Sequence, residues 1–369
     1  MSGAQVEIQF IAILTAVACA LPGVFLVLRK MAMMSDAVSH AILFGIVVAY
    51  FIVKDISNPF LILGAALAGL LTVLLVELLY KTRLLKEDAA IGLVFPLLFS
   101  LGVIMVSRFA SHVHLDTDAV LLGELAFAPF DRLTIAGVDI GPKTMWVIAG
   151  ILLLNVAFLT SFYKELKLVT FDAGLAGALG LAPAAIHYSL MGLVSLTAVG
   201  SFDAVGAVLV VALMIVPPAT AYLLTDRLFH MLLLAAGFGA LSAVTGYWGA
   251  VWMDANIAGS MATMTGVWFA VVFALAPDRG LLAQARRRKR QRWEFARRML
   301  IVHILQHENE ADSSTECSVG HMQDHLHWGK DFADRVLRGA KKQNLVEVRN
   351  DCLFLTERGR ISAEKAMVE

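Results

Sequence analysis

An acid and an imidazole that can do chemistry lie four residues apart inside an apolar stretch of this sequence. Asp36 and His40 occur within residues 31–45, among hydrophobic runs long enough to cross a bilayer. At about 100° per residue, this spacing puts both side chains on one face of a helix, one turn apart. A carboxylate with an imidazole suits Mn²⁺, Zn²⁺ or Fe²⁺, and these ligand types do not choose among the three ions.

Two ligands from one helix are too few for a stable metal site. Two subunits that meet about a two-fold axis would supply two aspartates and two histidines, and ligands divided across an opening interface suit a site that must release its ion. The alternative is structural, with Asp36 neutralising a nearby arginine or capping a helix end, and His40 as a hydrogen-bonded core residue. An aspartate inside a membrane span costs roughly 2.5–3.5 kcal/mol on insertion scales, so it needs a compensating partner.

Composition indicates that the helices which position this pair belong to a polytopic membrane protein. Of 369 residues, 59% are hydrophobic, compared with roughly 45–50% in a soluble domain. The formal net charge is +0, so overall charge predicts no partner. The three cysteines form no CxxC pair, and the chain has no GxxxxGK[ST] loop for a Walker-type ATP site.

Nine apolar segments approach or exceed the roughly 20 residues that a helix needs to cross the hydrocarbon. They are residues 8–28, 38–53, 59–80, 89–107, 144–163, 184–200, 203–225, 230–253 and 258–277. Segments 38–53 and 184–200 are short, so eight spans is an open alternative. With nine spans, most Lys and Arg residues near the span ends fall on one side, which the positive-inside rule makes cytoplasmic, with the N-terminus outside and the C-terminus in the cytoplasm.

Two further segments carry candidate functional residues. The polar interval between Arg108 and Lys143 holds alternating ligand types that could pass a metal along the outer face, a solvated loop being the alternative: His112, His114, Asp116 and Asp118. Residues 168–183 predict a short cytoplasmic helix capped by Asp172. A short helix rich in small residues favours docking of a partner, and an ordinary connecting helix is the alternative.

Pro217 and Pro218 lie in the middle of an apolar segment. Because proline removes a backbone donor, the pair predicts a helix break that faces protein or a cavity.

Four motifs, in order, resemble the zinc/manganese-type ABC importer permease family. They are MSDAVSHA at 34–41, EDAAIG at 87–92, TFDAGLAGALG at 170–180 and VGAVLVVALMIVPPATA at 205–221. The resemblance covers residues from about 10 to 280. It implies a membrane subunit served by a separate cytoplasmic ATPase and an extracytoplasmic metal-binding protein, with Asp36 and His40 at the family's metal position.

The resemblance also implies that the helix at 170–181 is the coupling helix, which sits in a groove of the ATPase. The residues of this motif are Phe171, Asp172, Gly174, Gly177 and Gly180. The chain departs from the family where Ala173 and Gly174 replace a usual proline and acidic residue.

After residue 280 the sequence becomes polar and predicts a second module. Residues 281–292 form a basic linker that would attract anionic lipid. Residues 293–307 predict an amphipathic helix, with one apolar face formed by Trp293, Ala296, Leu300, Ile301 and Ile304. Helices at 319–328 and 330–343, a hairpin at 345–356 and a helix at 357–366 would follow. This order resembles the winged helix of diphtheria-toxin-repressor-type metal regulators.

The sequence leaves open what this tail binds. Basic residues in 330–342 are consistent with nucleic-acid binding, but a membrane tether makes promoter access awkward, so we favour a regulatory or interaction module. Cys317, His321 and His325 are candidate tail metal ligands, with ordinary surface histidines as the alternative.

We therefore expect an all-α polytopic membrane protein of eight or nine spans, residues 1–280, with a small α+β winged-helix-like cytoplasmic domain, residues 293–369. The expected function is the permease subunit of an ABC importer for manganese, zinc or iron in the bacterial plasma (inner) membrane. It would be no enzyme, hold no permanent cofactor, and pair with an identical or paralogous subunit. The alternative is a membrane-anchored, metal-responsive transcriptional regulator.

Overall fold

A computed structural model of the protein divides into two compact units, Met1–Gly280 and Leu281–Glu369. The structure describes residues 3–54, 60–109, 123, 125–135, 138–308, 317–318, 328–349 and 352–368.

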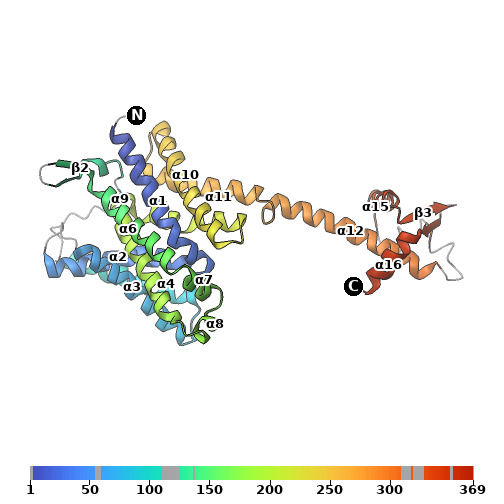
Figure 1. The fold of residues 1–369 in the computed structure, drawn as a ribbon, viewed down its shortest axis with the longest axis horizontal. Coiled ribbons are helices and arrows are strands. Elements are labelled where there is room, and N and C mark those ends of the chain that lie inside the picture. The colour runs from blue at the N-terminus through green and yellow to red at the C-terminus, as the bar shows by residue number, and fades with distance from the viewer. Residues whose placement is uncertain are drawn as a thin grey trace. The chain divides into compact units, whose positions relative to one another are not determined.

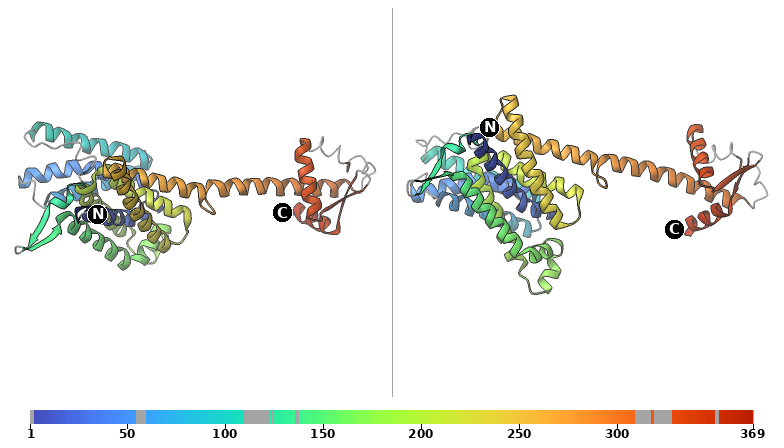
Figure 2. Two further views of the ribbon diagram at one scale, coloured as in Figure 1. Left: turned by 90° about the horizontal axis from the view of Figure 1, so that it is seen from above. Right: turned by 45° about the horizontal axis from the view of Figure 1, so that its top comes forward.

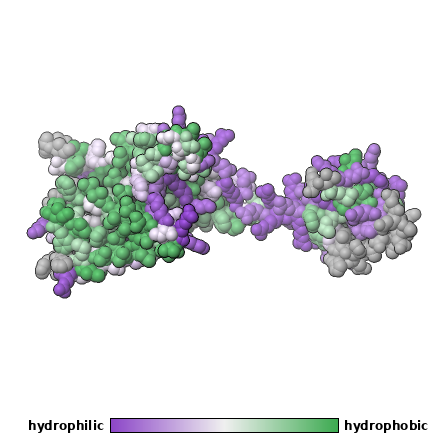
Figure 3. All heavy atoms as spheres, turned by 90° about the horizontal axis from the view of Figure 1, so that it is seen from below, coloured by the Kyte–Doolittle hydropathy of each residue, from purple (hydrophilic) through white to green (hydrophobic). Residues whose placement is uncertain are grey.

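The first unit is a bundle of long apolar helices (Figure 1). They are α1 (Gly3–Leu28), α2 (Ala32–Val53), α3 (Phe60–Lys81), α4 (Glu87–Phe109), α6 (Lys143–Ser161), α9 (Pro183–Leu224), α10 (Leu228–Met253) and α11 (Ile257–Leu275). Apolar side chains cover much of the visible surface of this unit (Figure 3), as expected for a surface that faces lipid. Within the described residues, nine segments are long and apolar enough to span a bilayer, because α9 contributes two, Pro183–Phe202 and Ala204–Leu224. The prediction of a polytopic helical membrane protein is confirmed, with nine candidate spans.

The chain turns back within α9, at Gly206. The backbone angles of this residue, φ 75° and ψ 166°, lie outside the helical region. On one side of it, Ser201 contacts Cys19 of α1, and on the other, Met214 packs against Gly23 of α1. Ser201 and Met214 are 13 residues apart in α9, yet their partners Cys19 and Gly23 are only four apart in α1. A straight helix could not make both contacts, so the two halves of α9 run in opposite directions.

The prolines of α9 do not break it, contrary to the prediction from Pro217 and Pro218. The helix continues through both residues to Leu224. Pro218 leaves the carbonyl of Met214 without its intrahelical donor. That carbonyl packs so closely on α1 that a Cβ atom at Gly23 would come within 2.0 Å of it. The freed carbonyl therefore faces protein, as expected, while the change of direction belongs to the glycine.

Helix α1 lies in the core of the bundle and packs mainly on α9, α10 and α6. A buried amide ties three of these helices together. Asn155 of α6 donates through Nδ2 to the carbonyl of Ala18 at 2.9 Å and to Thr197 Oγ1 of α9 at 3.1 Å. In a low-dielectric interior a satisfied amide of this kind specifies one arrangement of its neighbours.

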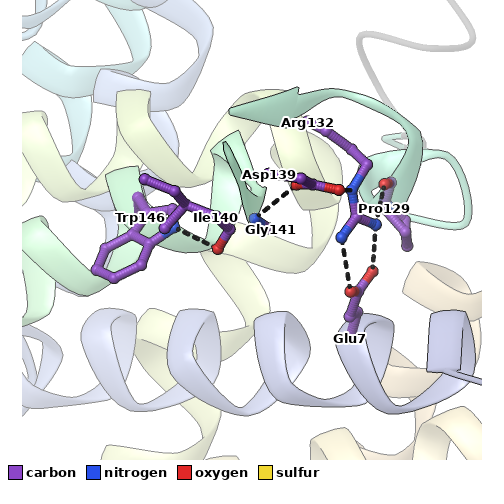
Figure 4. A network of polar contacts seen from close by, with 7 residues as sticks. All are labelled: Glu7, Pro129, Arg132, Asp139, Ile140, Gly141 and Trp146. Carbon is purple, nitrogen blue, oxygen red and sulfur yellow. Dashed lines mark hydrogen bonds and ion pairs between the residues drawn. The ribbon is translucent and has the colours of Figure 1, made fainter. Parts of the chain in front are cut away.

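A β-hairpin sits near the N-terminal end of α1. Strands β1 (Arg132–Ile135) and β2 (Val138–Pro142) pair antiparallel after the 3₁₀ turn η1 (Ala128–Phe130). Arg132 joins the hairpin to α1, with its guanidinium 3.3 and 3.4 Å from the two carboxylate oxygens of Glu7 and also paired with Asp139 (Figure 4). The Gly141 N–H donates to Asp139, which with the Arg132 pair holds the pKa of that carboxyl below its usual range.

The second unit contains α12 (Leu281–His307), α15 (Lys330–Lys342), the antiparallel strands β3 (Val346–Arg349) and β4 (Cys352–Leu355), and α16 (Glu357–Val368). The face expected on its first helix is confirmed. Ala296, Leu300, Ile301 and Ile304 are buried, and the Trp293 ring stacks on Phe332 with 4.9 Å between centroids.

The basic stretch 281–292 is helical and forms the first part of α12, drawn in orange (Figure 2). The described elements of the second unit, with the single small strand pair β3–β4, do not support the expected winged helix. Of the helix expected at 319–328, only Trp328 lies among the described residues.

The crossing of α2 and α3 depends on small residues. A Cβ atom added at Gly45 would lie 2.5 Å from the carbonyl oxygen of Gly64 and 2.6 Å from the Cβ of Ala68. One added at Gly92 of α4 would meet no described atom within 4 Å. Gly92→Ala should stabilise the protein by about 0.5–1 kcal/mol through helix propensity. Gly45→Ala should instead destabilise it by about 1–3 kcal/mol through overpacking.

Thermal unfolding in detergent measures both variants against the wild type. The opposite directions of the two shifts are the test, and a raised unfolding temperature for Gly45→Ala would contradict the close crossing.

Candidate metal and coupling sites

Asp36 and His40 lie on one edge of α2, as their spacing predicts. The distance from His40 Nε2 to Asp36 Oδ1 is 3.5 Å. The aspartate side chain is 34% exposed and that of the histidine 33%. They are the fifth and ninth of the 22 residues of α2, so the pair lies nearer to the helix end that follows Arg29.

Packing fixes the orientation of the histidine ring. His40 stacks on Phe95 of α4 at 5.5 Å between centroids and meets the edge of Phe99 at 5.8 Å. On an adjoining face of α2, Ser35 and Ser39 are buried, and Ser35 donates to Met214 Sδ at 3.3 Å. Helices α3, α4 and α9 thus surround most of α2, and the Asp36–His40 edge remains partly open.

The described part of one subunit does not complete a metal site. No group of three or more His, Cys, Asp or Glu residues among the described residues is placed to hold an ion. The pair alone leaves most positions of a four- to six-coordinate ion free. In geometry it is half a site.

The other predicted metal ligands lie mostly outside the described residues. These are His112, His114, Asp116 and Asp118 of the expected outer-face relay, and His321 and His325 of the tail. Cys317 is described and is buried in the core of the second unit.

The segment that sequence analysis singles out for docking contains the end of one short helix, α7 (Tyr163–Phe171), and the whole of a second, α8 (Ala173–Ala178). Residues 163–180 are called the coupling segment below. Asp172 caps α8 as predicted, accepting the Leu175 N–H at 2.8 Å. Three large apolar side chains here face outward: Phe171 is 61% exposed, Leu175 48% and Leu179 65%.

The backbone conformation requires glycine at one position of this segment, and the surrounding space does not require it at two others. Gly180 has φ +83°, a conformation that favours glycine, just after α8. Among the described residues, a Cβ atom at Gly177 would meet nothing within 4 Å, and one at Gly174 only its own neighbour Asp172 at 3.4 Å. The described part of this subunit therefore does not exclude a side chain at Gly174 or Gly177.

Sequence reasoning missed a polar network at the end of the bundle that carries the coupling segment. Arg29 follows α1 and contacts Thr170 of α7 and His187 of α9, each at 3.2 Å. In α3, Glu77 accepts a hydrogen bond from the hydroxyl of Tyr188 and pairs with Lys81 at 2.8 Å. The sequence marks Arg29 only as a cation near a span end, and its partners are more than 140 residues away.

A cavity of about 270 Å³ opens beside this network. Met34 lines it two residues before Asp36, and Glu77, Glu87 and His187 line it as well. The Asp36–His40 edge and the polar network therefore lie at the same end of α2, with this cavity between α2, α3, α4 and α9.

Comparisons with known proteins agree on one family. The model of the ABC 3 transport family matches residues 6–276. The manganese transport system membrane protein MntD of Bacillus subtilis (strain 168) is 50% identical over 272 residues, which is 74% of this chain and 92% of MntD. The zinc transport system membrane protein TroD of Treponema pallidum (strain Nichols) is 45% identical over 353 residues, 96% of each chain. The structure of PsaBC from Streptococcus pneumoniae in complex with Fab is similar at a TM-score of 0.63 and 27% identity, over 76% of this chain and 94% of that one.

Proposed function

This chain belongs to the ABC 3 transport family, and on that premise we propose that it is the permease subunit of an ATP-driven importer for manganese, zinc or iron. It is a multi-pass permease of the plasma membrane rather than an enzyme. In this proposal a separate cytoplasmic subunit hydrolyses ATP, and an extracytoplasmic binding protein delivers the ion. The names of MntD and TroD, which specify manganese and zinc transport, support a divalent metal as cargo.

The half-site on α2 is the observation that carries the proposal. Asp36 and His40 present a carboxylate and an imidazole, each about one third exposed, on an open edge of a helix that packs on α3, α4 and α9. A second permease subunit, identical or paralogous, would bring the other two ligands and bury the charge. Because a subunit boundary can open, a site divided across it can release the ion as readily as it binds it.

The coupling segment supplies the contact with the ATPase. Its exposed Phe171, Leu175 and Leu179 are the apolar anchors that a groove on a partner would cover. Asp172 holds the start of α8 in shape, and the bare surface at Gly174 and Gly177 lets the partner's backbone approach. With this end in the cytoplasm, the C-terminus is cytoplasmic too, because α11 runs toward the same end, where Arg279 contacts Tyr222 and Asp226.

The second unit then serves regulation or interaction rather than transcription. TroD aligns over 353 of the 369 residues, and therefore over most of this unit, so a zinc transport membrane protein carries the same extension. This disfavours a free-standing regulator. The first half of α12 carries a basic run from Arg286 to Arg290 that suits contact with anionic lipid.

The metal proposal predicts that Asp36→Asn and His40→Gln each reduce metal uptake at least about tenfold, since even outer-shell partners of a metal are worth 10–100-fold in affinity. Uptake of radioactive Mn²⁺ and Zn²⁺ by cells that carry the whole transporter measures this. His230→Gln, at an exposed position of α10, is the matched control. Uptake at the wild-type rate by both site variants, at equal membrane levels, would defeat the assignment.

The docking proposal predicts that Phe171→Ala weakens binding of the ATPase at least about fivefold, as truncation of a buried aromatic anchor costs more than about 1 kcal/mol. Phe229→Ala is the control, because its side chain is 59% exposed in this subunit but lies outside the coupling segment. Titration of the purified ATPase onto the permease in detergent gives both affinities. Equal affinities for the two variants would remove Phe171 from the interface.

A chain ended after Gly280 should import metal at the rate of the full chain. The length of MntD supports this expectation. Its 272 aligned residues are 92% of its chain, so MntD is too short to contain a counterpart of the whole second unit. Uptake by the truncated and full chains, at matched membrane levels, is the measurement. Loss of uptake in a truncated chain that still inserts and binds the ATPase would show that transport itself requires the second unit.

A further inference from the structure

We propose that Arg29 transmits movement of the coupling segment to the metal-bearing helix α2, as a positioning residue of the transport cycle. This inference rests on the proposed function and adds to it the route between the ATPase contact and the metal half-site. It concerns a side chain that contacts neither the ion nor the ATPase.

The backbone holds Arg29 firmly at the corner between α1 and α2. The N–H groups of Lys30 and Met31 bond to the carbonyls of Val27 at 3.1 Å and Leu26 at 2.9 Å, and Lys30 has φ 61°. These are the two bonds of a Schellman motif, which ends α1 tightly. Helix α2 begins at Ala32, so a displacement of this corner displaces the first turns of α2.

The guanidinium of Arg29 connects this corner to two other elements. Its Nε donates to Thr170 Oγ1 at 3.2 Å, in the last turn of α7. Thr170 lies two residues before Asp172, the cap of α8. The Nη1 group lies 3.2 Å from Nδ1 of His187 in α9, and because a guanidinium only donates, that nitrogen must be the acceptor.

The environment of the guanidinium favours exchange of its partners. Its Nη2 is buried and has no hydrogen-bond partner among the described residues. Burial lowers the pKa of Arg29 to about 10, so the group is still charged at neutral pH. A buried charge with an unpaired donor is costly, and a conformation that gives Nη2 an acceptor is correspondingly favoured. The guanidinium is therefore placed to exchange partners when the coupling segment moves, as a switch requires.

Two routes lead from the coupling segment to α2. One runs through apolar packing, because α7 and α8 pack on α9, and α9 packs on α2. The other is the Thr170–Arg29 link, which reaches the start of α2 across a single hydrogen bond. The second route is the proposal, and removing the bond without changing the packing separates the two.

The experiment uses the whole transporter, with its ATPase and binding protein, in lipid vesicles. Arg29→Met removes the guanidinium, and Thr170→Val removes only the hydroxyl that accepts its hydrogen bond. The control is Arg227→Met, which removes an exposed arginine from the N-cap of α10. Mn²⁺ imported per ATP hydrolysed should fall at least about fivefold for Arg29→Met, the lower end of typical coupling factors. Thr170→Val should lower the same ratio, and the double variant should be no worse than Arg29→Met.

A second readout does not depend on transport. Met33, in the first turn of α2, is exposed, and Met33→Cys gives a thiol there in a chain whose Cys352 is changed to serine. Adding ATP should change the rate of thiol labelling at position 33 in the otherwise wild-type transporter, and Arg29→Met should abolish this change while the ATPase stays bound.

An unchanged ratio with an unchanged labelling response in Arg29→Met would overturn the inference and leave the packing route. So would a labelling rate that ATP never alters, or loss of the ATPase from Arg29→Met, which would make the residue part of the docking site. Failure of wild-type vesicles to import Mn²⁺ or Zn²⁺ while labelling still responds through Arg29 would instead count against the metal proposal and in favour of the link.

Discussion

An ionisable carboxylate inside an apolar helix bundle is the constraint on which the structure depends. Asp36 cannot be placed in α2 without a partner that offsets the loss of water, because a bare acid there costs several times the thermal energy. Within the described residues its imidazole neighbour, 3.5 Å away, supplies part of that compensation. The rest must come from the open edge, which is where an ion and a second subunit would lie.

The remainder of the bundle keeps that edge in place. Small residues let α2 and α3 cross so closely that even one Cβ atom at Gly45 has no room. The turn of α9 at Gly206 returns Met214 to contact Ser35, and the aromatic rings of α4 hold His40 from the side. The tight end of α1 then sets where α2 begins. Each contact restricts α2 to movement as a unit, and a helix that moves as a unit can open or close a divided site.

How much of this the sequence predicts depends on how local each signal is. The spans follow from length and hydropathy, and the Asp36–His40 spacing and the Asp172 cap follow from helix periodicity, so all of these are found where expected. Gly206 has no such signal, because nothing in the sequence distinguishes it from other glycines in apolar runs. The Pro217–Pro218 pair instead leads to the prediction of a break that the helix does not contain. The Arg29 network joins residues more than 140 positions apart, and no pattern along the chain predicts such contacts. In the second unit, the amphipathic face of α12 is predicted correctly, but the order of elements is too common to establish a winged helix.

The central claim is that two copies of the Asp36–His40 half-site together bind one metal ion. The most direct test is to load the purified transporter with Zn²⁺, count the ions per permease subunit and examine their ligands by X-ray absorption. The account predicts one ion for every two permease subunits, with two imidazole nitrogens and carboxylate oxygens as ligands. One ion per subunit, or a ligand set without two imidazoles, would contradict it.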